Sequence, residues 1–117
     1  MICTTSGTLG DPKCAINTHK NLISGINCSA ALGFRFSSDD RYLSYVTLSH
    51  IMEQLIIFMC VKHGMQICFA RFTGDVWGGP DPLLLMEDLQ SLKPTLFASF
   101  PLFFNKIYRN VQNSLPA

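Results

Sequence analysis

Short segments rich in β-branched and aromatic residues alternate with amphipathic helical segments along this chain, and that alternation limits its fold more than any other feature. Residues 41–48 and 65–70 are segments of the first kind. Residues 18–32 are of the second kind, because Leu22 and Ile26 fall on one face of a helix. This order predicts an α/β fold of alternating strands and helices with a largely parallel sheet.

Local signals give the expected limits of these elements. The predicted strands are residues 1–5, 15–17, 41–48, 65–70 and 95–100. The predicted helices are residues 18–32, 50–64 and 83–92, with a fourth that begins at Pro101. Thr18 and Ser49 are suited to helix N-caps, since a hydroxyl accepts a bond from a free first-turn N–H. Gly33 and Gly64 are suited to ending the first two helices.

The composition is poor in charge. Apolar residues make up 48% of the 117 residues and charged residues 15%, against about 25% charged in an ordinary soluble domain. A piece of the interior of a larger domain has this composition, and so does a small membrane-associated protein. Residues 1–10 do not form a signal peptide, and no run approaches the roughly 20 apolar residues of a spanning helix. With a net charge of +1 and no basic stripe, nothing indicates nucleic-acid binding.

The five cysteines are widely and irregularly spaced, without a C-x-x-C pair. This spacing argues against a zinc site or a disulfide framework. We expect reduced cysteines of an intracellular protein, most of them buried as small apolar side chains.

Residues 4–13, T-T-S-G-T-L-G-D-P-K, are the strongest candidate for a binding site. They follow a short apolar strand, and their glycines allow several backbone N–H groups to converge on one anion. The hydroxyls of Thr5, Ser6 and Thr8 are further donors, and Lys13 adds a mobile positive charge suited to a polyphosphate. By composition alone, a hydroxyl-rich surface turn explains this stretch equally well.

Three segments resemble one known family. Residues 5–14, T-S-G-T-L-G-D-P-K-C, resemble the T-S-G-T-T-G-x-P-K-G signature of the adenylate-forming enzymes. Residues 42–54, Y-L-S-Y-V-T-L-S-H-I-M-E-Q, resemble the S-Y-L-P-L-A-H-x-x-E segment of the long-chain fatty acyl-CoA synthetases. Residues 83–108, with Gly74-Asp75-Val76 before them, resemble the L-K-P-T and N-K-I-Y region of the same branch. The likeness covers nearly the whole chain.

The resemblance implies a fragment of the large N-terminal, AMP-binding domain of a long-chain fatty acid–CoA ligase. Such enzymes use ATP, Mg²⁺ and coenzyme A to convert a fatty acid to an acyl-adenylate and then to an acyl-CoA. It also implies association with the endoplasmic reticulum, mitochondrial outer membrane or peroxisome. The residues that would hold the ATP phosphates are Thr5, Ser6, Gly7, Thr8, Gly10 and Lys13.

Other residues have two interpretations each. By the resemblance His50 would help to position the acyl carboxylate or close the pocket, but a structural role at a helix start is as well supported. Glu53 would pair with His50 or face solvent, and the second is preferred. His63 is expected to meet the helix dipole. The phenylalanines of residues 97–104 would line an acyl tunnel or, by preference, belong to the core.

The chain also departs from the family pattern. Cys14 occupies the position of a glycine, where it would strain the turn if that position needed a positive φ or a close backbone approach. The later adenine, ribose and catalytic-lysine motifs are not found, so we expect this piece to be inactive without the remainder of the synthetase. The alternatives are a catalytically dead remnant that acts as a nucleotide- or acyl-binding or interaction module, and a membrane-surface protein. We also expect the isolated chain to be poorly soluble or to associate.

Overall fold

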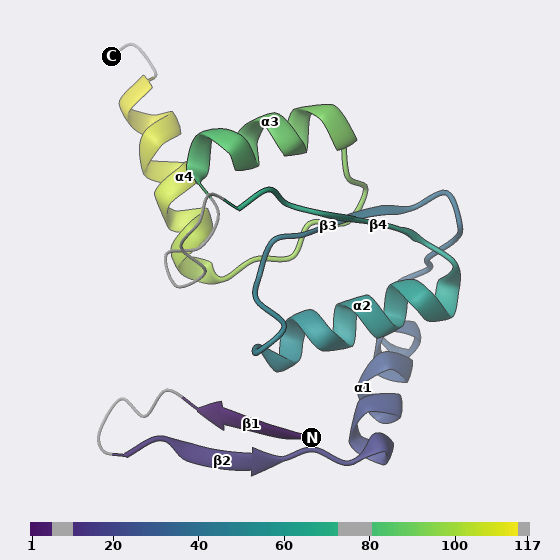
Figure 1. Ribbon diagram of the computed structural model, residues 1–117. Helices are drawn as coiled ribbons and strands as arrows, with labels where there is room; N and C mark the ends of the chain where they lie inside the picture. The colour runs from purple at the N-terminus through teal and green to yellow at the C-terminus, as the bar shows by residue number, and fades with distance from the viewer. Residues whose placement is uncertain (6–10, 73–80, 115–117) are drawn as a thin grey trace.

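The computed structural model describes residues 1–5, 11–72 and 81–114 (Figure 1). In chain order its elements are β1 (Ile2–Thr5), β2 (Lys13–Ile16), α1 (His19–Ala31), β3 (Arg41–Ser44), α2 (Ile51–His63), β4 (Gln66–Phe69), α3 (Pro82–Leu92) and α4 (Pro101–Ser114). The predicted mixed α/β class is confirmed. None of the described helices is long and apolar enough to cross a bilayer.

Strand β3 is the centre of the larger body of the structure, which consists of β3, β4 and the helices packed on them. It pairs in parallel with β4, with Tyr42 opposite Ile67, and Tyr42 also forms a parallel bridge to Leu96 on its other side. Helix α2 covers one face of this sheet and α3 covers the other (Figure 1). Because both faces are covered, successive residues of β3 enter two different cores.

The two cores lie on opposite faces of β3. Tyr42 packs with Cys60 and Met65 on the α2 side. Leu43 packs with Ala70 and Leu85 on the α3 side. The partly buried residues around the first core are Phe36, Ile56, Ile67, Leu96 and Ala98. Those around the second are Val46, Cys68, Leu89, Leu92, Phe97 and Phe103.

The expectation of a largely parallel sheet is wrong. The described strands form two separate two-stranded sheets, and β1 pairs with β2 antiparallel, with Ile2 opposite Ile16 and Thr5 opposite Lys13. The physical reason is the short connection. Residues 6–12 can close a hairpin, whereas a parallel crossover needs about a dozen residues or more. The hairpin is exposed, and all four residues of β2 are accessible to solvent.

Residues 95–100 do not form the predicted strand. Thr95 and Leu96 both donate their N–H groups to the Arg41 carbonyl, and Leu96 alone makes a bridge to β3. The chain then leaves the ladder, because the ring of Phe97 stacks on Tyr45 at 5.5 Å and meets Phe103 of α4 at 5.7 Å. Aromatic packing therefore replaces strand pairing here. Strand β3 is also shorter than predicted and ends at Ser44.

The caps confirm three of the four expected helix limits. Thr18 accepts a bond from the Asn21 N–H at 3.2 Å, and the Asn21 side chain accepts one from the Thr18 N–H at 3.0 Å. Gly33 and Gly64 follow their helices with φ of 84° and 69°. Ser49 is not a cap, because His50 is the N-cap residue of α2 and makes no side-chain cap bond.

Arg41 joins β3 to the end of α3. Its Nε donates to the Leu92 carbonyl at 3.1 Å and its guanidinium also reaches the Lys93 carbonyl at 3.0 Å. Lys93 has a left-handed φ of 51°, which turns the chain back towards the sheet. Thr95 then accepts from the Arg41 N–H at 3.0 Å and donates to Asp40 at 2.6 Å.

The cysteines are less buried than expected. All five are free, but only Cys60 is buried, while Cys14 and Cys28 are exposed. Large apolar side chains are exposed as well, including Ile16 at 76% and Leu102 at 81%. Self-association of the isolated chain stays a prediction, and this apolar surface is its physical basis.

Replacing Thr95 by valine is expected to make the stability of the chain less sensitive to acid. The bond from the Thr95 hydroxyl is the main cause that lowers the pKa of Asp40. Such a group contributes stability that is present above its unfolded pKa of about 3.9 and lost as the pH falls through its folded pKa. Loss of the Arg41–Thr95 bond should also cost about 1 kcal/mol at neutral pH.

The measurement is the urea midpoint of both chains at about pH 7 and about pH 3. The midpoint should fall less on acidification in Thr95→Val than in the unsubstituted chain. An equal fall in both chains would show that the Thr95–Asp40 bond does not contribute to the acid dependence.

Cys60 is expected to resist alkylation while the chain is folded. Burial, with a smaller contribution from Glu53, raises its pKa to about 11, so only about a thousandth of it is thiolate at about pH 8. Mass spectrometry after brief treatment with iodoacetamide should find Cys14 and Cys28 modified and Cys60 unmodified. In guanidinium chloride all three should react, and equal labelling of Cys60 in the folded chain would contradict the prediction.

Candidate functional site

The β1–β2 hairpin brings together the two ends of the predicted phosphate loop. Thr5 is the last residue of β1 and Lys13 the first of β2, and they are opposite each other in the register. Lys13 is exposed. Four of the predicted phosphate-binding residues lie outside the described residues, namely Ser6, Gly7, Thr8 and Gly10. The hairpin thus places one cationic side chain beside the point where a glycine-rich loop leaves a strand.

Cys14 does not strain this hairpin. It lies within β2, opposite Thr4, and among the described non-glycine residues Lys93 is the one with a positive φ. The positive φ that would have strained this position is therefore not present. Side chains alternate along a strand, so Cys14 and Lys13 point to opposite faces of the hairpin.

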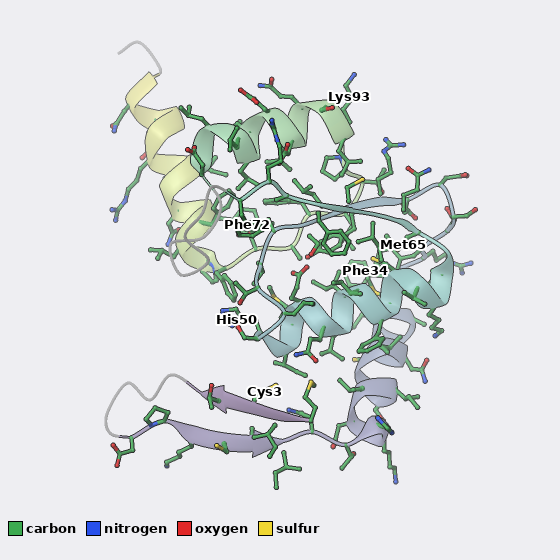
Figure 2. All side chains as sticks on the ribbon, in the orientation of Figure 1. Cys3, Phe34, His50, Met65, Phe72 and Lys93 are labelled. Atoms are coloured by element: carbon green, nitrogen blue, oxygen red, sulfur yellow. The ribbon has the colours of Figure 1, made fainter. Side chains whose placement is uncertain are left out.

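His50 lies at the N-terminal end of α2 (Figure 2). Its backbone N–H donates to the Thr47 carbonyl at 3.0 Å, and its exposed ring meets the edge of Phe100 at a centroid distance of 5.2 Å. The neighbouring hydroxyls of Thr47 and Ser49 bond to each other at 2.6 Å. The turn from β3 into α2 therefore presents an imidazole at the carboxyl end of the parallel pair.

A hollow of about 370 Å³ opens at the same carboxyl edge. Its lining residues are Ser44, Val46, Thr47, Leu48, Phe69 and Phe72. Ligands of open α/β sheets bind outside the carboxyl ends of the strands. Among the described lining residues, Ser44 and Thr47 are the ones with polar side chains, so the hollow suits an apolar group better than a charged one.

Glu53 is in the core, where neither sequence interpretation placed it. Its side chain is fully buried, and the Tyr42 hydroxyl donates to its Oε2 at 2.6 Å. Its Oε1 has no hydrogen-bond partner among the described residues. One signal could have found it, because Glu53, Ile56 and Cys60 share a helix face by their i, i+3, i+7 spacing.

This buried carboxyl group affects its neighbours. Burial, and then the hydrogen bond to Glu53, raises the pKa of Tyr42. Burial also raises the pKa of Tyr45, whose hydroxyl has no hydrogen-bond partner among the described residues. Both phenols are therefore neutral at any physiological pH, and the Tyr42 hydroxyl keeps the proton that it donates to Glu53.

The phenylalanines of residues 97–104 and His63 mostly pack against other side chains. Phe97 and Phe103 belong to the core on the α3 side, as preferred, whereas Phe100 and Phe104 are 40% and 47% exposed. His63, in the last turn of α2, meets the ring of Phe36 edge-on at 5.8 Å.

A second apolar groove of about 440 Å³ runs between α1 and α2. Its lining residues are Gly25, Ile26, Cys28, Ser29, Leu32, Phe34, Phe36, Ile51, Met52, Leu55, Ile56 and Met59. Among the residues that the structure describes, no group of three or more His, Cys, Asp or Glu side chains could hold a metal ion.

Known proteins resemble this chain over nearly its whole length. Residues 1–116 match the AMP-binding enzyme family. Long-chain-fatty-acid–CoA ligase 5 of Mus musculus is 41% identical over 97% of this chain and 16% of its own length. The peroxisomal long chain acyl-CoA synthetase 6 of Arabidopsis thaliana is 37% identical over 97% of this chain and 15% of its own. Long-chain-fatty-acid–CoA ligase 1 of Homo sapiens is 35% identical over 95% and 15%.

A solved structure has the same fold. The o-succinylbenzoate CoA synthetase (MenE) of Bacillus subtilis, in complex with the acyl-adenylate intermediate OSB-AMP, superposes with a TM-score of 0.67. It is 22% identical and covers 92% of this chain and 26% of its own. The chain thus spans about a sixth of the length of the curated relatives described above. By the match over residues 1–116, the chain belongs to the AMP-binding enzyme family.

Proposed function

We propose that this chain is part of the AMP-binding domain of a long-chain fatty acid–CoA ligase and forms its ATP phosphate-binding loop. The observation that carries the proposal is its 35–41% identity, over nearly all its length, to proteins named as such ligases. The signature at residues 5–14 falls inside that match. No observation favours the alternative of a catalytically dead remnant.

In the proposed reaction a fatty-acid carboxylate oxygen attacks the α-phosphorus of ATP. The bond from the α-phosphorus to the bridging oxygen breaks, and pyrophosphate leaves with its electron pair. The thiol of coenzyme A then loses its proton and attacks the acyl carbon, and AMP leaves. Mg²⁺, bound to the phosphate oxygens, would neutralise part of their charge.

The loop would act on the leaving pyrophosphate. The backbone N–H groups of Gly7 and Gly10, with the hydroxyls of Thr5, Ser6 and Thr8, would donate to the β- and γ-phosphates. Lys13 would bring a positive charge to the same oxygens. Its exposed place opposite Thr5, at the loop end of the hairpin, supports this role.

His50 would orient the fatty-acid carboxylate. Its exposed ring at the carboxyl end of β3, held against Phe100 beside an apolar hollow, supports this role. An imidazole N–H can donate to one carboxylate oxygen and leave the other to attack the phosphorus. The apolar hollow would exclude water near the reacting atoms.

The proposal extends to the rest of the protein. The complete ligase would take a long-chain fatty acid, ATP and coenzyme A, and would associate peripherally with a membrane inside the cell. One of the relatives described above is named as peroxisomal. The endoplasmic reticulum and the mitochondrial outer membrane are the other candidate locations.

Lys13→Ala is expected to weaken the binding of Mg-ATP by tenfold or more, since a charge-assisted bond contributes roughly 1.5–3 kcal/mol. The measurement is isothermal titration calorimetry of the 117-residue chain with Mg-ATP, with circular dichroism to confirm that each chain is folded. Lys20→Ala is the matched control, because Lys20 is an exposed lysine of the same charge on α1.

The calorimetry tests whether this loop binds ATP phosphates through Lys13. Saturable heat that is lost in Lys13→Ala and kept in Lys20→Ala would support the phosphate loop. Equal affinity in the two variants would contradict the role of Lys13. No binding by a folded chain would contradict the binding of ATP phosphates by this piece on its own.

A further inference from the structure

One polar contact crosses the core between α2 and the sheet. Glu53, in the first turn of α2, accepts a hydrogen bond of 2.6 Å from the hydroxyl of Tyr42 on β3. Both side chains are fully buried. A buried polar group is costly unless it is bonded, so Tyr42 and Glu53 stabilise the core only while they remain together.

The other bonds at the N-terminus of α2 go to the turn before the helix and not to the sheet, since the His50 N–H donates to the Thr47 carbonyl and the Gln54 side chain donates to the Leu48 carbonyl. His50 caps the helix without a side-chain bond, and the Ser49 hydroxyl is bonded to its neighbour Thr47. Among the described residues, Tyr42–Glu53 is the one side-chain hydrogen bond between α2 and β3. The other end of α2 is held separately, by Gly64 in its left-handed conformation and by the bond from the Met65 N–H to the Cys60 carbonyl.

We propose that Tyr42 and Glu53 are positioning residues that hold His50 at the carboxyl edge of the sheet. His50 precedes Glu53 by three residues, less than one helical turn. A change in where Glu53 meets β3 therefore moves the His50 ring relative to Phe100. What His50 then does for a substrate rests on the proposed function, whereas its placement does not.

A purely structural role for the bond would act on the whole helix. His63 distinguishes the two cases, because it lies in the last turn of the same helix and packs against Phe36. Tyr45 offers the matched control on the sheet. It is a second buried tyrosine just beyond β3, and its hydroxyl has no partner among the described residues.

The experiment records proton–carbon NMR spectra of the three histidine rings in the full chain. The variants are Tyr42→Phe, Glu53→Gln and the control Tyr45→Phe. In Tyr42→Phe the His50 ring should lose its nuclear Overhauser contact to Phe100, and its chemical shifts should move towards those of the exposed His19. His63 should keep its contact to Phe36. Glu53→Gln and Tyr45→Phe should resemble the unsubstituted chain, since a carboxamide oxygen still accepts from Tyr42.

Three results would overturn the proposal. The first is an unchanged His50 spectrum in Tyr42→Phe, and the second is equal spectral changes at His50 and His63. The third is global unfolding of Tyr42→Phe, which would show that the bond stabilises the whole fold and does not specifically position His50. Decanoate, added to the unsubstituted chain, then tests the proposed function separately. If decanoate leaves His50 unperturbed although Tyr42→Phe displaces it, the positioning holds and the substrate role of His50 fails.

Discussion

The burial of β3 on both faces is the constraint on which the rest of the larger body depends. Tyr42 has neighbours in every direction, since its backbone pairs with Ile67 and Leu96 and its ring is enclosed under α2. Leu43 faces the opposite way, towards α3. A four-residue strand therefore fixes the relative places of two helices, and the turn that carries His50 follows directly from it.

The sequence predicts the helices of this fold well and its strands less well. Helix limits follow from local chemistry. The Thr18 hydroxyl caps the start of α1, and Gly64 ends α2 because glycine readily adopts the left-handed conformation. Strand pairing is a property of two distant segments. Residues 95–100 have the composition of a strand, but the stacking of Phe97 on Tyr45 takes them out of the ladder after Leu96. Nothing within that segment indicates this competition.

The candidate site shows the same division. A local motif predicts a phosphate loop and its lysine, and the structure adds that Thr5 and Lys13 are opposite each other in a hairpin. The burial of Glu53 was found only from the tertiary structure, because a carboxyl group is expected on the exposed face of a helix. Its i, i+3, i+7 relation to Ile56 and Cys60 indicates the buried face, yet its partner Tyr42 comes from another element and cannot be found by helical spacing.

The two parts of the site differ in how they are held, and the difference suits their proposed roles. The hairpin that carries Lys13 is exposed along all of β2, so few contacts oppose its movement. His50, in contrast, begins a helix whose first turn is bonded through Glu53 to the most buried residue of the sheet. A group that grips a leaving phosphate must release it after the first step, whereas a group that orients a carboxylate works best from a fixed position. The proposed phosphate-binding lysine therefore lies on an exposed hairpin, and the proposed carboxylate-orienting imidazole lies at the start of a helix that is bonded to the core.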